Sequence, residues 1–413
     1  MHNKMGCQFS GTLVILEGKD MKRCFILFLV LLMMLCCVSC APAEKQPAVE
    51  GNYYNFETDD QSTARVLTNT GRIVESEKGF YFVSATGYLF FTDKSTMETT
   101  LLCNRPECLH QKQGSTSENP CNAYVGYSLV GGPFYYEGNL YCITEEQEAD
   151  QPSSHPALTQ ISLDGTQRKV VWKMNELETT LQDGILHRGK FFYIDSNEDM
   201  STFYLRAYDL KSKKVDTIYE NDNFFRGLRG LGDAIYWREP MSSPTTDTNR
   251  FLRYSTIDGT ITSYDGVYDM YFDGEKVFFF HYKAEMDPEQ VSYWFSQIDL
   301  DGGNQREVSV DRQEGMVKEY RTDGKYLYEY TFLGGGIHVY DYTTFQFLKT
   351  IQEPEQLDIN YNLICADGKV FLFSHEFDLI FYCTAEDIAS EDFAWKSMRS
   401  VEYHADGTET PLP

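Results

Sequence analysis

The chain has almost no helical periodicity and carries none of the short signatures of common hydrolases. Its 413 residues contain no G-x-S-x-G, H-E-x-x-H or Ser-x-Asp-x-Gly-x-x-Trp sequence. These absences exclude the nucleophile elbow of serine hydrolases, the zinc helix of metalloproteases and the repeated Asp-box of sialidases. Basic residues are also scarce, since 36 Lys and Arg stand against 62 Asp and Glu. Nucleic-acid binding depends on basic side chains that contact phosphates, so we expect no nucleic-acid partner.

No apolar run is long enough to cross a membrane as a helix. The longest, Cys24 to Val38, would extend about 22 Å at ~1.5 Å per residue, short of a ~30 Å hydrocarbon core. It follows a basic start, Met21-Lys22-Arg23, and ends at Ser39-Cys40. This order of segments predicts a signal peptide over residues 1–40, in which residues 1–20 are read as an upstream extension. Polar residues 41–65 are expected to form a flexible tether.

The small residue directly before Cys40 resembles the lipobox of bacterial lipoproteins. The resemblance implies that Cys40 is acylated and becomes the mature N-terminus, which would anchor the protein to the extracytoplasmic face of the cell membrane. One position departs from the family pattern, because Cys37 stands where the family prefers Leu. Plain secretion is the alternative.

Aromatic residues, in contrast, are abundant and recur in a repeated phrase. Phe, Trp and Tyr make up 15% of the chain. The third residues of the first and last phrases are 81 and 371, so six steps cover 290 residues at a mean period of about 48. This period predicts an all-β, seven-bladed β-propeller with four antiparallel strands per blade, as a single domain over residues 66–413. The phrases are GFYF (79–82), NLYC (139–142), KFFY (190–193), AIYW (234–237), KVFF (276–279), KYLY (325–328) and KVFL (369–372).

The fourth phrase carries a family resemblance. Ile235-Tyr236-Trp237-Arg238-Glu239 is similar to the tetrapeptide of low-density-lipoprotein-receptor-like, YWTD-type propellers, and departs from it at the third and fourth positions. The repeat more closely resembles the propeller lipoproteins of Gram-positive gut bacteria, over about residues 70–404. This resemblance implies a lipid-anchored, extracytoplasmic binding protein and says little about chemistry.

One loop interrupts the repeat with metal-binding residue types. Cys103, Cys108, His110 and Cys121 lie within nineteen residues, between the first and second phrases. Three thiols and one imidazole can complete a tetrahedral structural zinc site. Disulfides are the alternative in an oxidising compartment, with one thiol unpaired unless Cys142 joins the group, and free thiols are a third possibility. A similar Cys-Cys-x-His-Cys loop is implied by the resemblance to the gut lipoproteins.

Counting back seven residues from the start of each phrase locates the beginnings of the innermost strands. Five of the seven positions are polar or charged, and we expect them to form a ligand-binding rim at the channel mouth. The expected ligand is a glycan, a peptide or a partner protein of the cell envelope. A solvated rim, a carbohydrate-active enzyme using Asp183 and Asp269, and a structural assembly factor are the alternatives. The five rim residues are Arg72, Asp183, Asp269, Lys318 and Asn362, and the other two positions are Gly132 and Gly227.

Overall fold

A computed structural model describes most of the chain, in two units that are treated separately: Met1–Glu50 and Gly51–Pro413. In the first unit it describes β1 (Cys7–Phe9) and β2 (Thr12–Val14), which pair antiparallel. The predicted signal peptide core and Cys40 lie outside the described residues. In the second unit the described residues are 54–61, 72–108, 110, 121–126, 132–147, 154–174, 181–240, 249–284, 291–310, 317–331, 335–357, 361–374, 378–403 and 409–411.

The second unit is built from antiparallel sheets whose strands follow one another in chain order. The aromatic residues of each of the seven phrases lie in the second strand of its group, because side chains that alternate between the two faces of a buried strand can pack on both sides. The all-β prediction, with several four-stranded antiparallel sheets, is therefore confirmed. The first three groups are β3 (Ile73–Glu75), β4 (Gly79–Val83), β5 (Leu89–Asp93) and β6 (Thr99–Leu101); β7 (Phe134–Tyr136), β8 (Asn139–Gln147), β9 (Ser154–Ser162) and β10 (Arg168–Lys173); β11 (Asp183–His187), β12 (Lys190–Ser196), β13 (Phe203–Asp209) and β14 (Val215–Asn221).

The remaining groups include two departures from a four-stranded pattern. A single seven-stranded sheet holds the fourth and fifth phrases, and a fifth strand, β30, extends the last sheet. The seven-stranded sheet is β15 (Arg226–Leu231), β16 (Ala234–Pro240), β17 (Asn249–Ser255), β18 (Ile261–Phe272), β19 (Lys276–Ala284), β20 (Val291–Asp299) and β21 (Arg306–Val308). The last two sheets are β22 (Val317–Thr322), β23 (Tyr326–Thr331), β24 (Ile337–Asp341) and β25 (Phe347–Ile351); β26 (Tyr361–Ala366), β27 (Lys369–Ser374), β28 (Leu379–Thr384), β29 (Lys396–Tyr403) and β30 (Glu409–Pro411).

The long strand β18 joins two four-strand groups into one sheet. Its first half pairs with β17 and its second half pairs with β19. Gly266 stands between the halves with a φ of 71°, a left-handed conformation that glycine adopts without strain. The first half of β18 is thus the last strand of one group, and the second half is the first strand of the next.

The buried side chains form seven clusters in the described part of the chain, and each cluster lies between two consecutive groups of strands. One cluster joins the last group to the first, where the rings of Phe80 and Phe371 meet edge to face with centroids 4.9 Å apart. Burial of one such ring stabilises a fold by about 1.5–3 kcal/mol, so these clusters are the main attraction between sheets.

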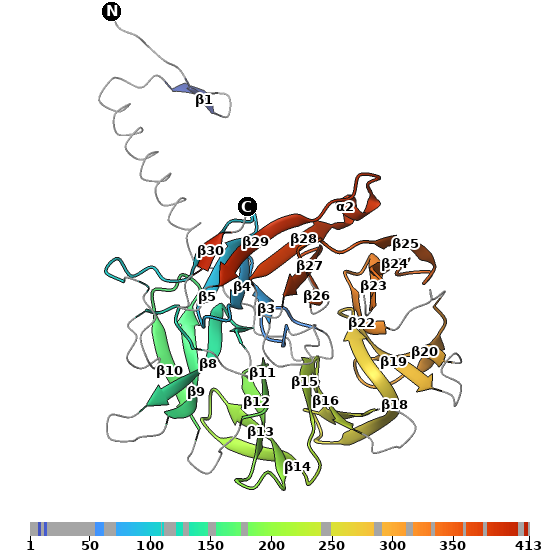
Figure 1. Ribbon diagram of the computed structural model, residues 1–413. Coiled ribbons are helices and arrows are strands. Elements are labelled where there is room, and N and C mark those ends of the chain that lie inside the picture. Colours follow the sequence, from blue (N-terminus) through green and yellow to red (C-terminus); the bar gives the residue numbers. More distant parts are fainter. Residues whose placement is uncertain are drawn as a thin grey trace, which may run out of the picture. The chain divides into compact units, whose positions relative to one another are not determined.

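The first strands of neighbouring groups contact one another in five cases. β3 contacts β7, β7 contacts β11, β11 contacts β15, β18 contacts β22, and β22 contacts β26. In Figure 1, strands such as β3, β11, β15 and β22 lie toward the middle of the unit, and β10, β14 and β25 lie outward. The beginnings of neighbouring first strands meet, as Asp183 of β11 meets Gly227 of β15 and Glu319 of β22 meets Leu363 of β26. The end at which these strands begin is here called the start end. They turn into their second strands at the opposite end, here called the turn end.

Helical structure is slight in the described residues. The short helix α2 (Ala385–Ala389) begins after Thr384, whose side chain accepts a hydrogen bond from the Asp387 amide. Asp387 in turn accepts from the amide of Thr384, which completes a capping box. Among the described residues, none of the helices has the length and apolar character needed to cross a membrane.

Candidate functional site

Seven equivalent positions mark the beginnings of the first strands. In each group, the residue directly before the first turn pairs with the residue directly after it. The equivalent position lies four residues before the first of these two residues. In the third group His187 pairs with Lys190, so the position is Asp183. The sixth position is Glu319 and not Lys318, because the turn in that group closes on Tyr326 and not on Lys325. Lys318 is the neighbouring residue of β22, and its side chain lies outside the described residues.

Asp183 connects two sheets through its carboxylate. Oδ2 accepts hydrogen bonds from the amides of Gly227 at 2.7 Å and Leu228 at 2.9 Å, both in β15, and Oδ1 accepts from the amide of Gly184. The residue is only 1% exposed. Burial raises the pKa of Asp183, and the nearby Arg72 and the three amides oppose that rise. This carboxylate links β11 to β15 and has little capacity left for a ligand.

Arg72 reaches across the second group to the third. Its guanidinium stacks over the ring of Phe134 at 4.8 Å, donates to the carbonyl of Gly184 at 2.8 Å and lies 3.8 Å from Oδ1 of Asp183. Gly132, which occupies the equivalent position of the second group, has no side chain there. Two of the five predicted rim residues are therefore brought together by the structure.

Glu319 forms the same kind of link as Asp183 between two other groups. Its Oε1 accepts from the amide of Leu363 in β26 at 2.9 Å, and its Oε2 accepts from Arg321 at 2.7 Å. Asp269 is 3% exposed and Asn362 is 8% exposed. We expected exposed rim side chains, but the described ones are largely buried because the first strands approach one another closely enough to share hydrogen bonds.

The Cys and His loop brings its four predicted residues together. The ligand atoms of Cys103, Cys108, His110 and Cys121 all lie within 4.8 Å of one another. Sγ of Cys121 is 3.5 Å from Nδ1 of His110. In a tetrahedral zinc site with Zn–S of ~2.3 Å and Zn–N of ~2.0 Å, a sulfur and a nitrogen ligand stand roughly 3.5 Å apart. The residues present therefore fit a zinc ion in number, type and spacing.

Backbone amides donate hydrogen bonds to the sulfurs of two of these cysteines. Sγ of Cys103 accepts from the amides of Arg105 and Asn122, and Sγ of Cys121 accepts from the amide of Ala123. Burial opposes ionisation at both residues. At Cys103 burial is outweighed by the hydrogen bonds from the two amides together with those from the thiols of Cys121 and Cys108, so its pKa falls below its ordinary value. At Cys121 burial prevails and raises the pKa to about 12.

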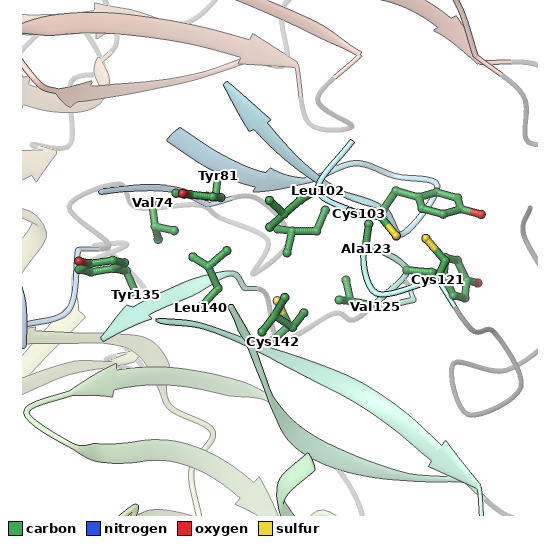
Figure 2. Close-up of a cluster of buried hydrophobic side chains, with 14 residues drawn as sticks. Val74, Tyr81, Leu102, Cys103, Cys121, Ala123, Val125, Tyr135, Leu140 and Cys142 are labelled. Atoms are coloured by element: carbon green, nitrogen blue, oxygen red, sulfur yellow. The ribbon is translucent and has the colours of Figure 1, made fainter. Parts of the chain in front are cut away.

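The six cysteines of the described second unit are all free thiols. Figure 2 shows the sulfurs of Cys103 and Cys121 turned toward each other, with Cys142 apart from them on the second group. Burial raises the pKa of Cys142 to about 12, so it behaves as a small apolar side chain. Cys142 is not among the four residues that gather around the candidate metal position.

No family model and no curated protein matches the chain. Similar solved structures include a prolyl endopeptidase, at 12% identity and a TM-score of 0.51 over 99% of this chain and 62% of that one. The β-propeller domain of the Trilobed protease from Pyrococcus furiosus has 11% identity and a TM-score of 0.44, over 63% of this chain and 79% of that one. BamB from Moraxella catarrhalis has 9% identity and a TM-score of 0.40, over 84% and 96%.

These similarities concern the fold alone, since every identity is 12% or lower. The chain spans less than two thirds of the prolyl endopeptidase. The similar structures include β-propeller proteins of varied functions.

Sequence reasoning missed two features of the inner strands. Glu319 was not predicted because the first turn of its group closes one residue later than in the other groups, which shifts the position counted back from the aromatic phrase by one residue. The segment 54–61 escaped because it is polar and lies in the predicted tether, 41–65, yet its described residues are packed against the sheets, with Asp59 fully buried. The tether prediction is therefore wrong for this segment, whose acidic side chains find buried partners far along the chain.

Proposed function

We propose that the chain is a lipid-anchored, extracytoplasmic binding protein built on a closed, seven-bladed β-propeller. The blade count is supported by the seven buried clusters, each between consecutive groups, including the one that joins last to first. The two halves of β18 supply one strand to each of two blades. Anchoring rests on Cys40 and the segment before it, and the resemblance to gut-bacterial propeller lipoproteins agrees with it.

The ligand site is placed at the start end of the inner strands. One observation carries this proposal: equivalent positions of different groups converge there, so that Arg72 of the first group reaches Gly184 and Asp183 of the third. A single small ligand at this end can contact several blades at once, which gives specificity from few side chains. A glycan, a peptide or an envelope protein are the ligands proposed.

The arrangement gives less support to a carbohydrate-cleaving enzyme. Such an enzyme needs a carboxylate pair free to exchange protons with substrate and water. Asp183 instead uses both oxygens to accept backbone amides. Binding without catalysis is the function that this geometry supports best.

The binding proposal is tested with glycan and peptide arrays probed by the folded protein. We expect Asn362→Ala combined with Asp269→Asn, at two of the equivalent positions, to weaken an array signal at least tenfold while the thermal midpoint stays within a few degrees. Asp183 is left intact because its loss would disturb folding. Asp216→Asn, at an exposed position of β14, is the matched control and should bind as wild type does. An unchanged signal in the folded double variant would contradict a start-end site.

We further propose that Cys103, Cys108, His110 and Cys121 hold a structural zinc ion. The ion would cross-link a loop between the first and second blades. Gly165 of the second blade packs beside this loop, where Asn122 donates to its carbonyl at 2.9 Å. All four positions of a tetrahedral ion would be filled by protein, which suits a structural and not a catalytic role.

A further inference from the structure

Residues 54–61, here called the N-terminal segment, cross the turn end of the inner strands. Their contacts reach five consecutive groups, and the contacted residues lie at or near the first turns of those groups. The N-terminal segment thus lies across the turn end, opposite the end at which the ligand site is proposed. The contacted residues are Glu75, Tyr135 and Glu137, His187 and Arg188, Gly230, and Phe272.

Backbone hydrogen bonds fix the middle of the segment. The carbonyl of Glu57 accepts from the amide of Glu137 at 2.8 Å, and the carbonyl of Thr58 accepts from the amide of Arg188 at 2.6 Å. Both donors are turn residues with positive φ, 43° and 47°. Their amides point out of the turns, toward the segment, so two turns of different groups are held by one stretch of chain.

Asp59 pairs with an arginine of the third group. Its Oδ1 lies 2.7 Å from Nε of Arg188 and its Oδ2 lies 3.3 Å from Nη2, a two-point contact. Asp59 is fully buried, and Arg188 also binds Asp233 in the first turn of the fourth group. Burying a carboxylate without a partner costs several kcal/mol of folding free energy. Asp59 can therefore be buried here because Arg188 pairs with it.

Asp60 enters between the first strands. Its amide donates to Nδ1 of His187 at 3.0 Å, and its Oδ2 accepts from the amide of Gly230 at 3.2 Å. Its Oδ1 lies 3.9 Å from Nη1 of Arg72. The carboxylate therefore stands between three groups and reaches the same arginine that contacts Asp183 at the start end.

The two ends of the segment are held as well. The ring of Tyr54 meets that of Phe272 at 5.4 Å, in the fifth group. Gln61 bonds twice to Glu75 of the first group, accepting from its amide at 2.7 Å and donating to its carbonyl at 3.0 Å. These two hydrogen bonds resemble the backbone pairing of a neighbouring strand.

We propose that residues 54–61 are an intramolecular clasp that closes the turn end of the channel and locks the first five blades together. Ligand access is then restricted to the start end. This consequence rests on the proposed binding function, whereas the clasp itself does not.

The clasp is tested by hydrogen exchange and mass spectrometry on the full chain. In wild type, we expect protected amides at Asp60, Glu137, Arg188 and Gly230. Asp60→Ala should speed exchange at Glu137, Arg188 and Gly230 together by at least tenfold, although only the last of these donates to the Asp60 side chain. Asp59→Asn, which keeps the size of the side chain, should give a smaller change of the same pattern, and the exposed-site variant Asp216→Asn should give none.

Exchange of residues 57–61 at the rate of an unstructured peptide in the wild-type protein would overturn the clasp. So would an Asp60→Ala effect confined to Gly230. Because this readout needs no ligand, it separates the two proposals. If the amides are protected but the start-end variant still binds ligand, only the proposed binding site is contradicted. If the amides are not protected but the start-end variant loses binding, only the clasp is contradicted.

Discussion

At the scale of single residues, close backbone approach at Gly230 is a requirement of the inner strands. A Cβ on Gly230 would lie 2.5 Å from Nδ1 of His187 and overlap its ring. The ring is fixed from both sides, since Nδ1 accepts from the Asp60 amide and Nε2 donates to the carbonyl of Gly232 at 2.8 Å. It can move only by breaking these bonds.

Gly230→Ala should therefore lower the free energy of unfolding by about 1–3 kcal/mol, the usual cost of overpacking, plus part of the lost hydrogen bonds. Urea denaturation measures the change. Gly303→Ala is the control, because the atoms nearest to its added Cβ all belong to the side chain of exposed Asp301, the closest at 3.1 Å. Equal stability of the two variants would contradict the close packing described for His187.

The buried side chain of His187 should also make the free energy of unfolding depend on pH. Its two hydrogen bonds require the neutral ring, and burial lowers its pKa below the ordinary 6.5, with nearby Asp59 opposing the shift. The unfolded chain then binds a proton near pH 6.5 that the folded chain does not, so stability is full above pH 6.5 and falls as pH drops below it. The loss is about 1.4 kcal/mol per unit of pKa depression. His187→Gln should flatten the stability profile between pH 7 and 5.5; an unchanged slope would contradict the neutral assignment.

At the scale of elements, the links between first strands are side-chain carboxylates that accept backbone amides. Asp183→Ala should leave the amides of Gly227 and Leu228 without this acceptor and remove one of the two carboxylates near Arg72, so that Asp60 is the one that stays. We expect a loss of roughly 3–5 kcal/mol in chemical denaturation. Asp216→Ala, on the exposed outer strand β14, should change stability by less than about 0.5 kcal/mol. An Asp183→Ala variant as stable as wild type would contradict this structural role and make Asp183 a candidate for ligand binding again.

The Cys and His loop gives the second prediction at this scale. Purified protein should contain about one equivalent of zinc by elemental analysis, and chelation should raise the number of titratable thiols and lower the thermal midpoint. Cys108→Ser should lower zinc content, whereas Cys142→Ser, outside the four-residue group, should not. Disulfides among Cys103, Cys108 and Cys121 in mass spectra of protein kept from air would contradict the metal site.

Elements with strong local signals could be predicted from sequence, and tertiary pairings could not. The phrases 190–193 and 276–279 predicted second strands because consecutive aromatics flanked by turns fill both faces of a buried strand. The four zinc-type ligands were recognisable by residue type. The burial of Asp183 was not, since a strand-start aspartate looks the same whether it meets solvent or a neighbouring amide. The docking of 54–61 depends on Arg188 and His187, more than a hundred residues away.

For the molecule as a whole, the membrane attachment proposed above depends on one residue, Cys40. Cys40→Ala should prevent acylation, so the protein should leave the membrane fraction or accumulate with its signal peptide uncleaved. Fractionation and gel migration measure both effects. Cys142→Ala, at a buried position of the second group, is the control and should stay membrane-bound. A Cys40→Ala variant that fractionates and migrates as wild type would contradict the lipoprotein proposal.

The central claim is that seven blades form one closed unit whose only open channel end binds ligand. The most direct measurement is a crystal structure of the protein with a glycan or peptide selected on the arrays. We expect seven four-stranded blades, residues 54–61 across the turn end, and ligand density at the start end near Arg72 and Asp269. Ligand density on the outer strands or at the turn end, with the start end empty, would contradict it.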